Sequence, residues 1–328
     1  MQRILVTGAT GCAGQGVLHY LFSKGYKSIF GMVRRIPVEK IENVTYVIGD
    51  FTDEDSINKI LTKHKIESIW HLGGAVHTSA NKKDFFEVNF QGTKNVIEAA
   101  IKSGVKNIVF ASSGSVYGKL KEIPVTEKHP IKPKGIYAKS KYNAEEAIKT
   151  LCDGNDIRGS IMRFPIIMGK NDRHFFPVLE KFTKKNLLPI IGNPNHKTSF
   201  VHPYDIAQAC EVLTNNPTKD VQRYNVVSYD CPFREIVETI EKYVVGRKRF
   251  KIRLPYFLTF VLFWLYELFF WIFIPKRQPT VNREYARMIG KDWIFSIDKL
   301  KQLGYSPTMN FESIVIDTTS EDKFPVPN

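Results

Sequence analysis

The chain has 328 residues, enough for one large α/β domain with a smaller lobe, and its 43% hydrophobic content excludes a disordered protein. A formal charge of +14 favours an anionic partner, such as a phosphorylated cofactor or an acidic membrane surface. No nucleic-acid-binding module accompanies this charge, so we expect no nucleic acid. The four cysteines are scattered without a metal-binding pattern, and the chain opens without a signal peptide. We therefore expect reduced thiols, no metal and a cytosolic active domain.

The chain opens with an apolar run, RILVT at residues 3–7, which predicts a buried strand. A glycine loop follows with Gly8, Gly11 and Gly14, and then an amphipathic helix that we expect to end at Gly25. Glycines allow a backbone to approach a pyrophosphate closely, and the helix N-terminus adds partial positive charge. Strand, loop and helix in this order predict dinucleotide binding.

The second predicted strand, residues 28–33, leads into Arg34 and Arg35. Folds that prefer NAD place a carboxylate here for the ribose hydroxyls. Two guanidinium groups instead suit a 2′-phosphate, so we expect NADP, with NAD remaining an alternative. The competing interpretation is a basic loop on a basic protein.

Three more apolar runs predict strands whose ends carry glycine or polar residues. The run VTYVIGD ends at Asp50, SIWHLGGAV (residues 68–76) runs into Gly73 and Gly74, and NIVFASSGSVYG (residues 107–118) ends in hydroxyl groups. Strands alternate with helices from residue 3 to residue 165. This order predicts an α/β fold with a doubly wound parallel sheet, and a ligand beyond the carboxyl ends of its strands.

A helix predicted around GIYAKSKYNAEEA, residues 135–147, carries Tyr137 and Lys141. Residues four apart lie on one helical face, so the phenol and the ammonium can point into one site. A neighbouring cation favours phenolate and lowers the pKa of tyrosine from its usual value of about 10. The alternative is a surface helix with a half-buried tyrosine.

Together these segments resemble the extended short-chain dehydrogenase/reductase family, also described as the NAD-dependent epimerase/dehydratase superfamily. The resemblance covers about the first 210 residues. It implies a Rossmann-type NAD(P)-binding domain in residues 1–165 and a smaller C-terminal substrate lobe in residues 166–328, partly interleaved with it. The matching motifs are Thr7-Gly8-Ala-Thr-Gly11-Cys-Ala-Gly14, Gly49-Asp50, His71-Leu-Gly-Gly74, Asn89-Phe-Gln-Gly92-Thr93, Ser112-Ser113-Gly-Ser-Val-Tyr-Gly118, Tyr137-x-x-x-Lys141, Arg163-Phe-Pro165 and Phe200-Val-His202-x-x-Asp205.

The resemblance assigns roles to individual residues. Tyr137 is similar to the proton donor or acceptor, and Lys141 to the residue that holds the nicotinamide ribose and lowers the pKa of Tyr137. Ser113 is similar to the hydroxyl that orients and polarises the carbonyl, and Asn89 to a residue that supports the site from the neighbouring strand end. The sequence departs from the family pattern at two places. Glycines follow His71-Leu72 where the family usually has alanines, and Pro203 stands where the family often has an aliphatic residue. The expected cofactor-binding residues are Gly8, Thr10, Gly11, Cys12, Gly14, Arg34, Arg35, Asp50, Phe51, Leu72, Gly73, Gly74, Tyr137, Lys141 and Pro165.

Residues 254–274, LPYFLTFVLFWLYELFFWIFI, are apolar apart from Thr259 and Glu267. This length is enough to cross a bilayer. Aromatic residues fall on every helical face, unlike a helix that covers a soluble core. Cations stand on both sides, so charge bias gives no orientation.

The tail after this stretch, KDWIFSIDKLKQLGYSP, resembles a segment that packs on the substrate lobe. A full crossing would leave that tail across the membrane from its own domain. We therefore expect a monotopic helix or re-entrant hairpin at the cytoplasmic face of a membrane, with cations on lipid phosphates. The alternatives are a homodimer interface or a core helix of a cytoplasmic protein.

Within the family, Pro255, Glu267 and Pro279-Thr280 followed by FSxDKxKQLGYSP are similar to the 3β-hydroxysteroid dehydrogenase and sterol-4-carboxylate 3-dehydrogenase branch. The leading hypothesis is an NAD(P)-dependent oxidoreductase acting on a hydroxyl or ketone of a sterol-like or other lipid. The main alternative is a nucleotide-sugar epimerase or dehydratase. The diphosphate of its substrate would bind cations of the lobe, for which Lys170, Arg173 and Lys181 are available. The third hypothesis is a non-catalytic NADP-binding scaffold.

Overall fold

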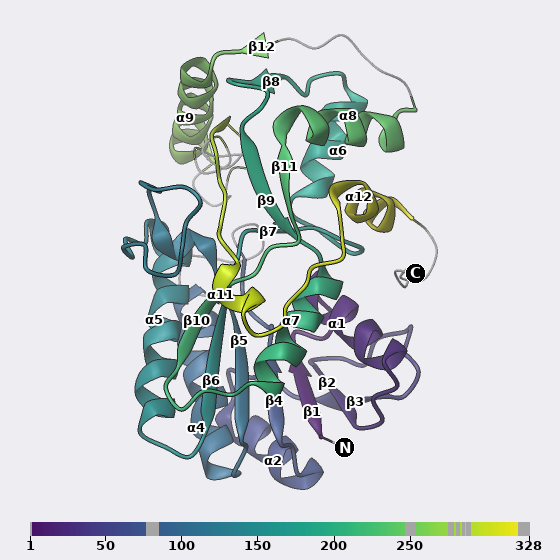
Figure 1. Ribbon diagram of the computed structural model, residues 1–328, viewed down its shortest axis with the longest axis vertical. Coiled ribbons are helices and arrows are strands. Elements are labelled where there is room, and N and C mark those ends of the chain that lie inside the picture. Colours follow the sequence, from purple (N-terminus) through teal and green to yellow (C-terminus); the bar gives the residue numbers. More distant parts are fainter. Residues whose placement is uncertain are drawn as a thin grey trace.

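The computed structural model describes residues 2–76, 85–246, 253–274, 279, 283, 286 and 290–320. The larger part of the molecule is built on a seven-stranded parallel sheet in the order β10-β6-β5-β4-β1-β2-β3 (Figure 1). The order reverses beside β1, where β4 and β2 flank it, so that a ligand crevice is expected at the carboxyl ends of these strands. The strands are β1 (Ile4–Thr7), β2 (Ile29–Val33), β3 (Val44–Ile48), β4 (Ser68–His71), β5 (Asn107–Ser113), β6 (Arg158–Phe164) and β10 (Gln222–Asn225).

Helices cover both faces of this sheet, which confirms the doubly wound α/β prediction. Successive side chains of a strand point to opposite faces, so Leu5 packs in one core while Ile4 and Val6 pack in the other. Both faces of the sheet are therefore shielded from water by helices, as is typical of a parallel sheet. The Leu5 face is covered by α2 (Glu54–His64), α4 (Gly92–Lys102) and α5 (Gly135–Asp153), and the opposite face by α1 (Cys12–Ser23) and α7 (Pro203–Asn215).

A smaller lobe stands above the carboxyl ends of the sheet (Figure 1). It has its own apolar core, in which Phe200, Phe233 and Phe311 are fully buried. The chain interleaves the two parts, because α7 and β10 belong to the larger part although they follow the first strands of the lobe. The lobe contains β7 (Ile166–Ile167), β8 (Ile190–Ile191), β9 (Lys197–Val201), β11 (Tyr229–Pro232), β12 (Arg253–Leu254), α6 (Phe176–Lys184), α8 (Phe233–Val244) and α12 (Phe311–Thr319).

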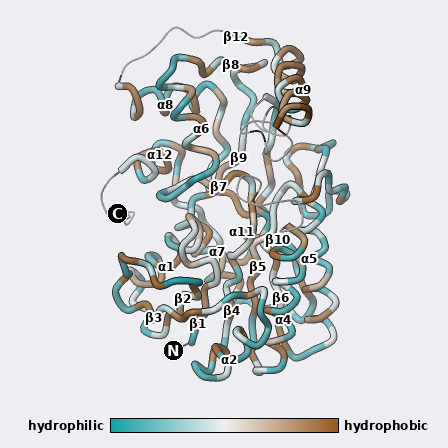
Figure 2. The backbone as a smooth tube through the Cα atoms, turned by 180° about the vertical axis from the view of Figure 1, so that it is seen from behind, coloured by the Kyte–Doolittle hydropathy of each residue, from teal (hydrophilic) through white to brown (hydrophobic). Residues whose placement is uncertain are grey.

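The apolar stretch forms helix α9 (Tyr256–Phe273) at the outer edge of the small lobe, coloured brown in Figure 2. It is long and apolar enough to cross a membrane by length and composition, yet only 6% of it is buried, so it is not part of the core. Thr259 is its single buried residue, whereas Phe257 and Trp271 are 77% and 73% exposed. The helix thus presents an aromatic surface to its surroundings.

The chain on both sides of α9 is attached to the same lobe. Before the helix, β12 pairs with β8. After it, Glu267 forms an ion pair with Arg283, with 2.7 Å between Oε2 and Nε, and Gly290 packs against the ring of Tyr256. Trp293 then bridges to Thr198, and α11 (Asp298–Lys301) follows on the larger part. The flanking cations at 247–249, 251, 276 and 277 lie outside the described residues.

Candidate active site

The glycine loop between β1 and α1 has no room for a side chain at Gly8 or at Gly14. Gly8 adopts φ +68°, and a Cβ on it would lie 2.7 Å from the Gly73 backbone. A Cβ on Gly14 would lie 2.1 Å from the carbonyl oxygen of Gly8. Helix α1 starts without a side-chain cap and without an acidic residue in its first turn. Its free N–H groups and its dipole therefore suit an anion such as a dinucleotide pyrophosphate.

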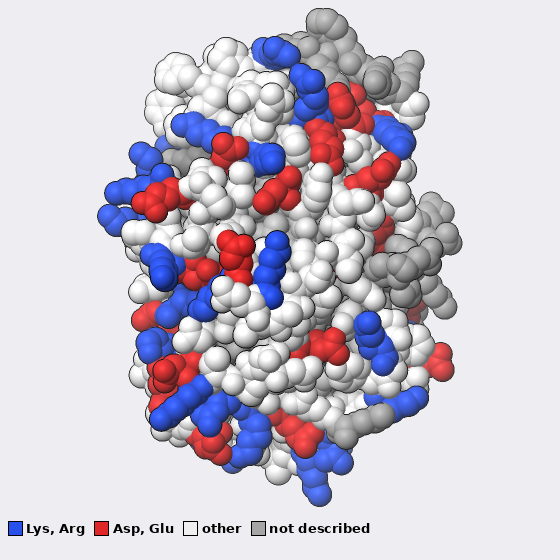
Figure 3. All heavy atoms as spheres, viewed as in Figure 1, with Lys and Arg blue, Asp and Glu red and all other residues white. Residues whose placement is uncertain are grey.

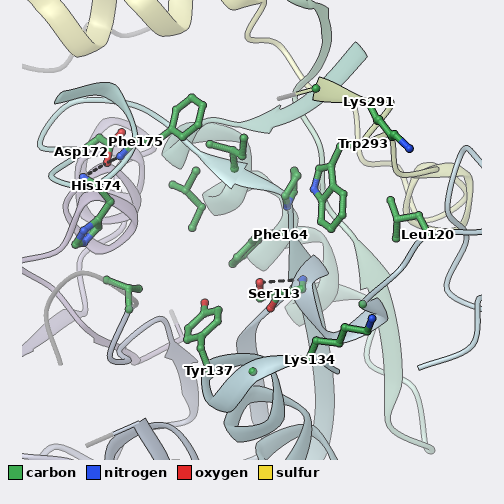
Figure 4. A pocket seen from close by; sticks show the side chains of 18 of the residues that line it. Ser113, Leu120, Lys134, Tyr137, Phe164, Asp172, His174, Phe175, Lys291 and Trp293 are labelled. Atoms are coloured by element: carbon green, nitrogen blue, oxygen red, sulfur yellow. Dashed lines mark hydrogen bonds between the residues drawn. The ribbon is translucent and has the colours of Figure 1, made fainter. Parts of the chain in front are cut away.

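A cavity of about 1160 Å³ extends from this loop to α9. Gly11 and Gly14 line one end, Ser113 and Tyr137 line the middle, and Tyr256 belongs to the far wall. Figure 4 shows the side chains of Ser113 and Tyr137 directed to one region of the cavity. One space therefore connects the cofactor loop, the reactive hydroxyl groups and the apolar helix.

Ser113 and Tyr137 form the hydrogen-bonded centre of the site. Ser113 ends β5 and accepts a hydrogen bond from the Ser115 N–H at 3.2 Å, where the short helix η2 (Gly114–Tyr117) begins. Burial raises the pKa of Tyr137, and its hydrogen bond with Ser113 counteracts part of that rise. The phenol is therefore protonated at neutral pH, as a general acid must be.

The structure corrects the expectation that Lys141 lowers the pKa of Tyr137. We expected its ammonium to lower the pKa of Tyr137, but burial raises that pKa and the Lys141 Nζ donates to the Ala111 carbonyl at 2.8 Å instead. Burial lowers the pKa of Lys141 itself to about 8, although the Glu145 carboxylate acts in the opposite direction. A Cβ on Gly74 would lie 3.0 Å from the Lys141 Nζ, so the ammonium lies against the loop that follows β4.

Asn89 holds two segments together below the reactive groups. Its Oδ1 accepts from the Ala75 N–H at 2.7 Å, and its Nδ2 donates to the Ala75 carbonyl and to Ser140 Oγ. Ser140 Oγ in turn donates to the Tyr137 carbonyl. Asn89 belongs to a π-helical turn, η1 (Glu87–Gln91), a feature frequent at functional sites. Its hydrogen bonds suit a supporting role, but Asn89 lies in this helical turn and not at the strand end that we expected.

His71 is a structural residue of the site to which the sequence analysis gave no role. Its Nδ1 lies 2.7 Å from Thr7 Oγ1 and its Nε2 lies 3.0 Å from Thr93 Oγ1. Since Thr93 donates to the Asn89 carbonyl, the network assigns the ring proton to Nε2. Burial and the nearby Lys141 lower the pKa of His71 to about 3, so the ring is neutral. It links β1 to α4 through Thr7 and Thr93.

Glu145 is the second residue that sequence reasoning missed. It lies one turn after Lys141 on α5 and is fully buried. It accepts hydrogen bonds from Ser112 Oγ at 2.5 Å, from the Arg163 guanidinium at 3.0 and 2.6 Å, and from Arg223 Nε at 3.1 Å. These bonds tie α5 to β5, β6 and β10 behind the site. The signal was a glutamate, the first of the pair Glu145-Glu146, four residues after the lysine on the same helix.

The remaining predicted cofactor residues divide between the cavity wall and its surroundings. Arg34 and Arg35 are exposed at the end of β2 and form no ion pair within the described part of the chain. Asp50 Oδ1 accepts from the Thr52 N–H and hydroxyl. The cavity is lined by Gly8, Gly11, Cys12, Gly14, Leu72, Gly74, Tyr137 and Pro165; Thr10, Arg34, Arg35, Asp50, Phe51, Gly73 and Lys141 lie outside its wall.

Packing explains the two departures from the family pattern. A Cβ on Gly73 would lie 2.6 Å from the ring of Phe51, which therefore occupies the space of the usual alanine. Pro203 is the first residue of α7, a position that suits its fixed φ. A Cβ on Gly16 would lie 2.3 Å from the Pro203 Cβ, so this proline packs directly on α1.

Comparison with known proteins finds one matching family model and several relatives of similar sequence. The model of the NAD dependent epimerase/dehydratase family matches residues 4–227. Protein y4nG of Sinorhizobium fredii is 25% identical over 97% of this chain and 78% of its own length. Sterol-4-alpha-carboxylate 3-dehydrogenase, decarboxylating, of Mus musculus is 25% identical over 96% of this chain and 89% of its own length. A putative UDP-glucose 4-epimerase of Methanocaldococcus jannaschii is 28% identical over 70% of this chain and 83% of its own length.

Solved structures have the same fold over nearly the whole chain. UDP-glucose 4-epimerase of Thermotoga maritima, solved with UDP-glucose, gives a TM-score of 0.74 at 18% identity, covering 96% of this chain and 97% of that one. WbmH of Bordetella bronchiseptica, solved in complex with NAD+, gives 0.75 at 16% identity and covers 97% of both chains. At these identities the likeness shows the shared fold alone.

Proposed function

The chain belongs to the NAD dependent epimerase/dehydratase family, and we propose that within it the protein is an NAD(P)-dependent oxidoreductase of a lipid hydroxyl or ketone. One observation carries this proposal: the cavity that contains Ser113 and Tyr137 ends against the first turns of the exposed aromatic helix α9. An apolar substrate leaving a bilayer along that helix would reach the reactive hydroxyl groups without crossing water. The relationship to a sterol dehydrogenase over 96% of the chain supports the same substrate class.

The residues of the site suit hydride transfer at a carbon that bears oxygen. The bound cofactor supplies or accepts the hydride. An oxygen placed between Ser113 and Tyr137 would accept a hydrogen bond from each, which stabilises negative charge developing there. Tyr137, protonated because burial raises its pKa, donates its proton in the reductive direction and regains it in the oxidative one. Lys141 supplies a buried cation beside the loop of Gly74.

For the cofactor, we propose a preference for NADP over NAD. The exposed Arg34 and Arg35 follow β2 directly and lie in a position to bind a 2′-phosphate. The test compares the Kd values of NADP and NAD at fixed salt for the wild type and for Arg34→Ala with Arg35→Ala. We expect the double substitution to remove the preference. Equal affinities of the wild type for NADP and NAD would refute the proposed preference.

We also propose that α9 holds the protein on the cytoplasmic face of a membrane without crossing it. Figure 3 shows uncharged side chains over α9 at the upper left, with Lys and Arg side chains interspersed with Asp and Glu below them, so that the apolar surface is the part suited to a bilayer. The pairing of Glu267 with Arg283 supports a hairpin, because it returns the chain along the helix. Glu267 at a bilayer centre would cost several kcal/mol.

The test of membrane attachment is fractionation followed by protease protection of a tag after Asn328. We expect sedimentation that resists high salt and a tag that is cut from the cytosolic side. A protected tag would show a true crossing. A protein found wholly in the soluble fraction at low salt would refute membrane attachment. A homodimer interface would then be the remaining explanation for the exposed apolar surface of α9.

The competing function is a nucleotide-sugar epimerase or dehydratase, favoured by the UDP-glucose 4-epimerases among the relatives. Lys170, Arg173 and Lys181, which we expected to hold its diphosphate, do not line the cavity. Lipid and nucleotide-sugar profiling after deletion of the gene separates the two functions. We expect a lipid alcohol or ketone to accumulate, and accumulation of a nucleotide sugar alone would overturn the proposal.

A further inference from the structure

The connection between η2 and α5, residues 118–134, lies beside α9 on one edge of the molecule. Figure 1 shows it at the left edge, between α5 and α9, and Figure 2 shows the same arrangement from behind. Leu120 and Ile123 of this connection line the same cavity as Phe257 of α9. Because Ile123 and Phe257 are also exposed, at 44% and 77%, they stand at the opening of that cavity.

The connection is held to the body of the protein, so its exposed side chains are presented in a fixed position. Val125 is fully buried, and its N–H donates to the Ile294 carbonyl at 2.8 Å. His129 is also buried, and its Nε2 accepts from the Lys121 N–H at 3.1 Å. These two anchors fix the short exposed stretch around Ile123 at the cavity opening.

The connection carries more positive than negative charge. Its five lysines are all exposed, and within the described part of the chain none of them forms an ion pair: Lys119, Lys121, Lys128, Lys132 and Lys134. Its two acidic residues are Glu122 and Glu127, and Glu127 Oε1 accepts from the Asn225 N–H at 2.8 Å. Five lysines against two glutamates leave a net charge of +3 beside the exposed Ile123.

This combination suits an anionic bilayer better than water or a second copy of the chain. Single exposed apolar side chains are common on proteins, but Ile123 shares the cavity opening with the aromatic surface of α9. A two-fold contact with a second copy would place the same patch on both sides, so that lysines would face lysines. An anionic bilayer instead offers phosphates to the ammonium groups and an apolar boundary to the isoleucine.

Resting on the proposed membrane attachment through α9, we propose that the connection of residues 118–134 is a second contact with the same anionic bilayer, and that the cavity opens onto the membrane between the two segments. Ile123 enters the acyl boundary and the lysines bind lipid phosphates. A lone helix in the interface leaves the protein free to rotate about the helix axis. A second contact removes that freedom and holds the opening against the bilayer, where a lipid substrate enters without crossing water.

The test places the environment-sensitive fluorophore NBD on the full-length protein and adds vesicles of phosphatidylcholine with and without phosphatidylglycerol. The label is attached at Ile123→Cys, and Val38→Cys is the matched control, because Val38 is apolar, 102% exposed and outside the cavity wall. Labelling of the wild type gives the background from the native cysteines, of which only Cys12 is partly exposed. On anionic vesicles, we expect the emission at position 123 to rise, to shift to the blue and to be quenched by nitroxide groups on the lipid acyl chains. The emission at position 38 should not change.

A second measurement removes charge without touching the cavity wall. The test variant replaces three lysines of the connection by glutamine, namely Lys121→Gln, Lys128→Gln and Lys132→Gln. The matched control replaces three exposed lysines near the amino ends of β2 and β4, namely Lys27→Gln, Lys63→Gln and Lys65→Gln. Each basic residue near an anionic surface contributes about fivefold to partitioning. The test variant should therefore lose at least about tenfold in binding to phosphatidylglycerol vesicles, and the control should stay at the wild-type value.

The outcomes separate this inference from the membrane attachment on which it rests. A label at position 123 that stays in water while the protein is bound to vesicles overturns the inference and leaves attachment through α9 intact. Equal losses in the two triple variants would show a non-specific attraction and also overturn it. If the label is shielded without vesicles as protein concentration rises, the surface binds a second copy and the inference is wrong. A wild type that binds no vesicles refutes the attachment itself.

Discussion

Replacing Glu145 by glutamine tests whether the buried charge network behind the site holds the fold together. Glu145 and Arg163 are both fully buried, and the carboxylate accepts two hydrogen bonds from that guanidinium. Glutamine keeps the shape but removes the charge, so that Arg163 is left as a buried cation without its counter-ion. Breaking such a pair costs about 3–5 kcal/mol. Because whole domains are stable by only about 5–15 kcal/mol, the loss is a large fraction of the total.

The assay is equilibrium urea unfolding followed by circular dichroism. With a slope of about 3 kcal/mol per M, the Glu145→Gln midpoint should fall by at least about 1 M. Asp156→Asn is the matched control, because its ion pair with Lys106 lies on the surface, and its midpoint should stay at the wild-type value. Adding Arg163→Met to Glu145→Gln should restore part of the loss, since no unpaired charge remains. A Glu145→Gln midpoint equal to that of the control, or strictly additive losses in the double variant, would refute the reasoning.

Three further predictions concern the site. Tyr137→Phe should lower single-turnover hydride transfer by about 10² to 10⁴ while the cofactor Kd stays within error, because one hydroxyl is lost; near-normal transfer would contradict its role. Gly14→Ala should abolish cofactor binding in titration calorimetry, because its Cβ would lie 2.1 Å from the Gly8 carbonyl oxygen. Gly154→Ala is the control, because its Cβ would make only an ordinary contact of 3.6 Å with the Thr150 carbonyl oxygen. The affinity for the cofactor should fall as pH rises through about 8, where Lys141 loses its proton, and a flat profile from pH 7 to 9 would show that this cation is not used.

The order of elements and the identity of the reactive groups could be predicted from the sequence because both depend on local spacing. Apolar runs ending in glycine or hydroxyl residues predicted β1, β4 and β5 to within a few residues. The four-residue spacing of Tyr137 and Lys141 on one helix follows from helical periodicity alone. The positions of Ser113 and Gly14 follow from the rule that ligands bind at the carboxyl ends of parallel strands.

Only the tertiary structure decided the electrostatics of these groups and the use of the remaining charges. The pKa of Tyr137 rises because distant segments, such as that of Phe85, exclude water from its ring. Spacing cannot show this, since desolvation depends on neighbours remote in the chain. For the same reason the sequence selected Lys170 for an anion, whereas folding leaves this lysine outside the cavity wall. Composition could identify α9 as apolar, but only packing determined that it is exposed beside the entrance to the site.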